Sequence, residues 1–74
     1  MDTEEMKGRI LEVLGAPGVR EPLSSGSIAL RLGIHWTLNP TAYERVGKNL
    51  SKLKKAGTVV LVRGKGWRLR DEST

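Results

Sequence analysis

Residues 41–70 read TAYERVGKNLSKLKKAGTVVLVRGKGWRLR, and the spacing of the apolar residues changes within this stretch. Its first part has apolar side chains at every third or fourth position, as along the buried face of an α-helix: Tyr43, Val46, Leu50 and Leu53. After Gly57 this period ends, and residues 58–62 form a β-branched, apolar run typical of a strand. The stretch therefore predicts a helix at about 41–56 followed directly by β-structure.

The end of the stretch predicts a β-hairpin at about 58–70. Residues 67–70 alternate between apolar and basic side chains, and the connection at 63–66 contains two glycines that tolerate a tight turn. The alternation directs Trp67 and Leu69 toward the core and directs Arg68 and Arg70 toward solvent.

Two further helices are expected before this stretch, at about 3–14 and about 25–32. Asp2 and Ser24 are suited to cap their N-termini, and Thr41 with Glu44 forms a T-x-x-E capping box for the helix at 41–56. In the loop at 34–40, Trp36 and Leu38 are too apolar for a free tether, so we expect both in the core.

These elements predict one α+β domain over residues 1–74, a three-helix bundle with a C-terminal β-hairpin. Residues 27–34, SIALRLGI, resemble the second helix and turn of helix-turn-helix domains, and residues 50–60, LSKLKKAGTVV, resemble the end of a winged-helix recognition helix. Nearly the whole chain is thus similar to the winged-helix DNA-binding domains, with no subfamily indicated. The loop at 34–40 exceeds the usual turn of three or four residues, so the resemblance does not fix how the third helix docks.

Charge is distributed unevenly along the chain, whose formal net charge is +5. Residues 1–40 carry four basic and five acidic side chains, whereas residues 41–70 carry nine basic side chains and one acid, Glu44. A basic half beside a near-neutral half is the footprint expected of a protein that binds a polyanion.

The winged-helix resemblance implies that the third helix enters the major groove and that the hairpin, the wing, contacts the flanking backbone or minor groove. Arg45 and Asn49 are the candidates for reading bases, since Arg can pair bidentately with guanine and Asn with adenine. The remaining candidates for DNA contact, chiefly with phosphates, are Thr41, Lys48, Lys52, Lys55, Arg63, Lys65 and Arg68. Gly47 interrupts the helix at a cost, and we expect close packing against the second helix, rather than close approach of DNA, to explain it.

Several classes of function are not expected. The chain has no cysteine and one histidine, His35, with no carboxylate at catalytic spacing, so we expect no enzyme activity, metal site, cofactor or small-molecule substrate. The acidic N-terminus is followed by no long apolar run, which argues against secretion and membrane insertion. A cytoplasmic, nucleoid-associated or nuclear protein is the expectation.

The expected function is double-stranded DNA binding, as a transcription regulator or a DNA-recognition module. Two alternatives remain open at this point: a winged helix that docks on an acidic protein partner, and one that binds structured RNA. Because one monomer places a single helix in one groove, we also expect a homodimer or membership of a larger complex.

Overall fold

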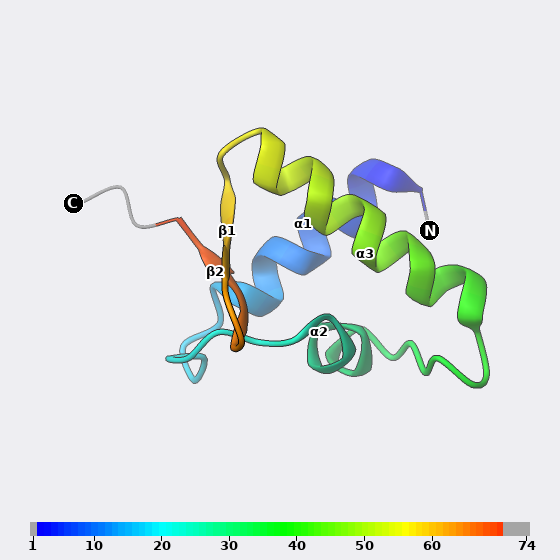
Figure 1. Ribbon diagram of the computed structural model, residues 1–74. Helices are drawn as coiled ribbons and strands as arrows, with labels where there is room; N and C mark the ends of the chain where they lie inside the picture. The colour runs from blue at the N-terminus through cyan, green and yellow to red at the C-terminus, as the bar shows by residue number, and fades with distance from the viewer. Residues whose placement is uncertain (1, 71–74) are drawn as a thin grey trace.

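The computed structural model describes residues 2–70, which form three helices and a hairpin in the order α1 (Thr3–Leu14), α2 (Ser25–Arg31), α3 (Pro40–Lys55), β1 (Val59–Val62) and β2 (Gly66–Leu69) (Figure 1). The α+β fold and the element order are those expected from the sequence. The arrangement is consistent with a winged helix.

The core lies where the three helices and the hairpin meet. Each helix contributes one face, β1 contributes its first residue and the α2–α3 loop contributes Ile34. Together they form a single cluster: Met6, Ile10, Leu14, Ile28, Ala29, Ile34, Val46, Leu50, Leu53 and Val59. Trp67 and Leu69 pack against this cluster from β2, while Arg68 and Arg70 are exposed, which confirms the predicted alternation.

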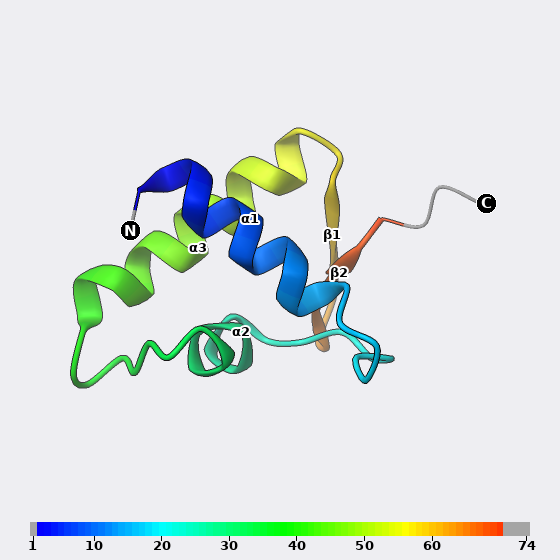
Figure 2. The ribbon, with the colours of Figure 1, turned by 180° about the vertical axis from the view of Figure 1, so that it is seen from behind.

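Helices α1 and α3 cross each other and expose opposite sides of the molecule. In Figure 1 α3 lies in front of α1, and in Figure 2, seen from behind, α1 lies in front of α3. The hairpin stands at the C-terminal end of α3, whereas the loop between α2 and α3 lies at the other end. One side of the domain therefore presents α3 together with the hairpin.

A backbone bridge that the sequence analysis did not predict fixes the hairpin to the start of α2. Strands β1 and β2 are antiparallel, with Val59 opposite Leu69 and Leu61 opposite Trp67. On the other side of β2, the Leu23 amide donates to the Trp67 carbonyl (2.9 Å) and the Trp67 amide donates to the Leu23 carbonyl (2.7 Å). These two bonds pair β2 on both of its edges.

Gly66 makes this close pairing possible. Its φ angle is +133°, a region that disfavours residues with a side chain, and a Cβ atom at this position would overlap the Leu23 carbonyl group. The second glycine of the hairpin connection is thus required by the approach of residue 23 as well as by the turn.

Two of the three predicted helix caps are confirmed, and the third is wrong. Asp2 Oδ1 accepts from the Glu5 amide (2.7 Å) and Ser24 Oγ accepts from the Ser27 amide (3.2 Å). Helix α3 begins one residue earlier than expected: Asn39 Oδ1 accepts from the Ala42 amide (3.2 Å) and Pro40 occupies the first turn. Asparagine is at least as good a cap as threonine, and proline suits the first helical position, so residues 39 and 40 together start the helix before Thr41.

Candidate nucleic-acid interface

The basic residues of α3 and the hairpin form a surface that we call the cationic face. On α3 it comprises Arg45, Lys48, Lys52, Lys54 and Lys55, and on the hairpin Arg63, Lys65, Arg68 and Arg70. All are exposed except Arg45, which is partly buried at its position beside the core. Thr41 is exposed in the first turn of α3. Eight of the nine residues predicted from the sequence to contact DNA therefore reach the surface.

No residue of the cationic face has a carboxylate partner among residues 2–70. Both ion pairs in this part of the chain lie within α1, where Lys7 Nζ is 3.6 Å from Glu4 Oε1 and Arg9 Nη2 is 3.2 Å from Glu5 Oε1. The described structure thus holds nine cations along α3 and the hairpin without an internal ion pair. Arg68 differs from the rest in lining a groove with Leu14, Arg20 and Glu21. Such a surface has a positive potential available to a polyanionic partner.

Asn49 is not part of this face, and the prediction that it lies on the exposed side of α3 is wrong. Its side chain is 3% exposed. Asn49 Nδ2 donates to the Arg45 carbonyl (2.8 Å) and to Met6 Sδ (3.1 Å) of α1. Asn49 follows Val46 by three residues and precedes Leu53 by four, so the helical period places it within the apolar stripe. Asn49 is a buried contact between α3 and α1.

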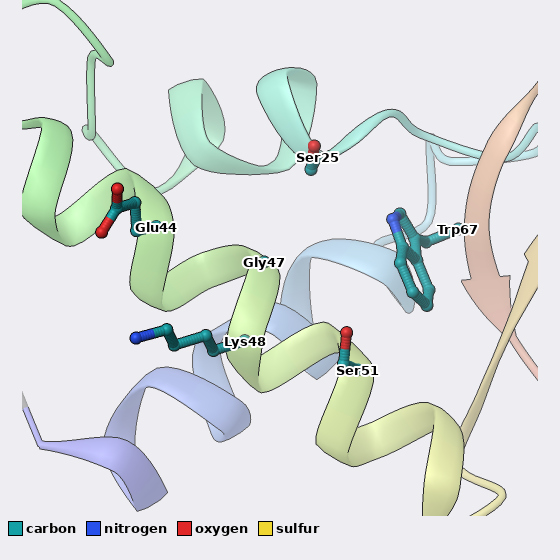
Figure 3. Close-up of a pocket in the computed structure, with 6 residues that line it drawn as sticks. All are labelled: Ser25, Glu44, Gly47, Lys48, Ser51 and Trp67. Carbon is teal, nitrogen blue, oxygen red and sulfur yellow. The ribbon is translucent and has the colours of Figure 1, made fainter.

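A hollow of about 580 Å³ adjoins the cationic face between α2, α3 and the hairpin (Figure 3). Its lining residues come from all three elements: Ser25, Glu44, Gly47, Lys48, Ser51 and Trp67. In Figure 3, Glu44 and Lys48 project from successive turns of α3, and Trp67 lies across the hollow on the hairpin side. The hollow therefore combines an acid, a base, two hydroxyls and an indole at one edge of the cationic face.

Gly47 lies in this hollow without any packing neighbour. A Cβ atom added at this position would meet no atom within 4 Å. Close packing against α2, which we expected from the sequence, therefore does not explain the glycine, and that expectation is wrong. A glycine inside a helix costs about 1 kcal/mol relative to alanine, and the open space above it leaves the backbone of α3 accessible to a partner.

The Glu44 carboxylate is also free of protein partners within residues 2–70. Glu44 does not take part in the capping box expected from the sequence. The Asn39 side chain alone caps α3. Neither a hydrogen bond nor an ion pair engages Glu44 in this part of the chain, even though Lys48 follows it by four residues. Sequence reasoning missed Glu44 as a site residue because the T-x-x-E motif supplied a structural explanation for it.

Trp36 and Leu38 do not pack in the core, and this expectation is also wrong. Their exposed fractions are 49% and 85%. The amides of Leu38 and Asn39 both donate to the His35 carbonyl (3.1 and 2.8 Å), and this tight turn directs the intervening side chains outward. Trp36 stacks on the His35 ring with centroids 4.5 Å apart and meets Tyr43 edge-on at 6.3 Å.

The structure gives His35 a local role in ordering this loop. Its Nδ1 atom is 2.6 Å from Thr37 Oγ1 and accepts from the Thr37 amide at 3.3 Å. Within residues 2–70, no group of three or more potential ligands among His, Cys, Asp and Glu is arranged to hold a metal ion. Over the same residues, no helix has the length and apolar character needed to cross a membrane.

Comparisons of the chain with protein-family models, with curated proteins and with solved structures found no match.

Proposed function

We propose that this domain binds double-stranded DNA, with α3 in the major groove and the hairpin against the flanking backbone or minor groove. The observation that carries the proposal is the cationic face, whose nine basic side chains lack carboxylate partners among residues 2–70. Phosphates along a duplex are the partners that neutralise many such cations at once, with release of condensed counterions.

The side chains differ in what each one contributes. Lys48, Lys52 and Lys55 present flexible point charges, which suit phosphates. Arg45 is partly buried and so better oriented, which suits bidentate contact with guanine. On the hairpin, Arg63, Lys65 and Arg68 contact the backbone or minor groove beside the site, and Thr41 contacts a phosphate near the start of α3. A second copy or a larger complex supplies further contacts.

The direct test is a fluorescence-anisotropy titration of labelled random duplex DNA at several salt concentrations. If about five phosphates are neutralised, log affinity should fall with log salt with a slope of roughly −4 to −5. An Arg45→Ala, Lys48→Ala, Lys52→Ala triple variant should reduce the slope by about 1.8, the share of the two phosphate-binding lysines, and should lower affinity on the order of a hundredfold at about 0.1 M salt.

A matched control removes three cations from other parts of the surface. Lys7, Arg9 and Arg31 lie on α1 and α2, and none belongs to α3 or the hairpin. Their replacement by alanine changes the net charge by the same amount but should leave the slope nearly unchanged. Equal losses in the two variants would show a diffuse charge effect and contradict the assignment to α3.

A protein partner is the second candidate function, and the exposed apolar residues of the α2–α3 loop favour it. Trp36, Pro40 and Tyr43, together with Glu44, line a hollow of about 550 Å³ beside the start of α3. An acidic partner could contact the cations while an apolar side chain enters this hollow. A folded protein that binds no DNA at low salt would favour this function over DNA binding.

A further inference from the structure

We infer that Glu44 selects a cytosine, by accepting a hydrogen bond from the exocyclic amino group of that base in the major groove. The inference rests on the proposed function. Glu44 is the only acid among residues 41–70. It lies on α3 in the hollow between that helix and the hairpin, next to Lys48 of the cationic face. A residue of opposite charge at this position needs an explanation of its own.

The chemistry of the carboxylate limits what it can contact on DNA. Glu44 has no hydrogen-bond or ion-pair partner within residues 2–70, so no contact in the described fold accounts for it. A phosphate would repel it, and guanine presents only acceptors, N7 and O6, in the major groove. Adenine places its N7 acceptor next to its amino group, whereas cytosine presents an amino donor alone. Cytosine is thus the base that best matches a carboxylate.

The position of Glu44 allows this contact to form. It lies in the first turns of α3, and the N-terminal residues of a recognition helix are those that reach base edges. Gly47 and Ser51 follow at three- and seven-residue spacing and line the same hollow. Because open space lies above Gly47, a base edge can approach the backbone of α3 closely at this point. Trp67 and Ser25 bound the hollow on its far side.

The test is selection from a duplex library with a randomised core, followed by sequencing of the bound DNA. The wild-type protein should enrich a cytosine at one position by about tenfold, the order expected for a base-specific hydrogen-bonded contact. Glu44→Gln should shift that position toward adenine, because glutamine pairs with adenine N6 and N7. Glu44→Ala should leave the position degenerate and preserve the rest of the motif.

A second measurement separates base reading from charge. Glu44→Ala should bind random DNA more tightly than the wild type, since the variant removes a carboxylate that repels phosphates. Glu12→Gln, in which an exposed acid of α1 loses its charge, should leave the motif unchanged. Both Glu44 variants should fold, because the side chain is exposed, and circular dichroism checks this.

The remaining outcomes distinguish a failure of the cytosine inference from a failure of DNA binding. Motifs that are identical in the wild type and both Glu44 variants, or wild-type binding without any cytosine preference, would overturn the inference while DNA binding stands. Failure of the folded wild type to bind any library member would overturn the proposed function as well.

Discussion

Helices α1 and α3 are built alike but expose different surfaces. Each is amphipathic, begins at an Asp or Asn cap and contains one glycine at which an added Cβ would meet no neighbour. On α1 four of the five charged side chains form ion pairs with one another, whereas the outer side of α3 leaves its cations unpaired within residues 2–70. The apolar face and the N-cap, which the two helices share, are sufficient for folding. The unpaired cations, which only α3 has, therefore mark the surface available for binding.

The two helices also differ in the core that they share. The buried residues of α1 are apolar, whereas α3 buries Asn49, whose Oδ1 atom has no hydrogen-bond partner within residues 2–70. We expect Asn49→Asp to have the largest effect on stability, a loss of about 3 kcal/mol at pH 7, because burial disfavours a carboxylate. Urea denaturation monitored by circular dichroism measures the loss.

The pH dependence of Asn49→Asp follows from the same cause. Burial would raise the pKa of the introduced carboxyl above its unfolded value of about 3.9. The penalty is therefore full at neutral pH and disappears as the pH falls toward about 4. Asn49→Leu, which removes the unpaired oxygen, should cost less than about 1 kcal/mol and retain DNA binding. Loss of DNA binding by a stable Asn49→Leu variant would show that Asn49 contacts DNA after all.

The N-terminal caps of the two helices provide a second comparison. Asp2→Ala and Asn39→Ala each remove an oxygen that accepts from a first-turn amide, and each should cost about 1 kcal/mol. Asp2→Ala should cost slightly more, because its charge also favours the positive end of the helix dipole. Thr41→Ala should change stability by less than about 0.3 kcal/mol, since Thr41 does not cap α3. Thermal melts of the three variants rank the effects, and a larger loss for Thr41→Ala than for Asn39→Ala would contradict the cap.

The fold was predictable because the spacing of apolar residues encodes it locally. The helical period in α3 and the alternation in β2 each mark the buried positions of a single element. The pairing of Leu23 with Trp67 was not predictable in this way, since it joins segments more than forty residues apart and leaves a trace only in Gly66. Asn49 was wrongly predicted on the exposed face because its side chain is polar, although its spacing of three residues from Val46 and four from Leu53 is that of the buried stripe.

The candidate site was predictable in its charge but not in its shape. The cluster of basic residues is visible in composition, and the structure exposes them along α3 and the hairpin. The hollow depends on how α2, α3 and the hairpin meet, which no single segment encodes. For Glu44 and Trp36, local patterns offered a structural role, in a cap and in the core, and only the three-dimensional arrangement shows that both side chains are exposed.

The two glycines inside helices that have open space above them provide a matched pair of variants. Gly8→Ala in α1 and Gly47→Ala in α3 should each stabilise the protein by about 0.5–1 kcal/mol, because both positions are helical and an added methyl group meets open space. Only Gly47→Ala should weaken DNA binding, by a few-fold, because its methyl group faces the hollow. Denaturation and anisotropy titrations on both variants test this. Equal DNA affinity in the two variants would place DNA away from Gly47.

Surface charge should have the smallest effect on stability, with opposite signs on the two helices. Glu5→Gln breaks the pair with Arg9 and should cost about 0.3–0.5 kcal/mol at low salt. Lys52→Gln instead relieves repulsion from Lys48 and Lys55, four and three residues away, and should stabilise the fold by about 0.2–0.5 kcal/mol. Both changes should shrink at about 1 M salt, where charges are screened within about 3 Å. If Lys52→Gln also destabilised the protein, the cations of α3 would contribute to folding. Their lack of carboxylate partners within residues 2–70 would then no longer point to a binding surface. If Glu5→Gln destabilises the protein and Lys52→Gln stabilises it, α3 holds its charges at a cost to stability, as expected for side chains that bind an external polyanion.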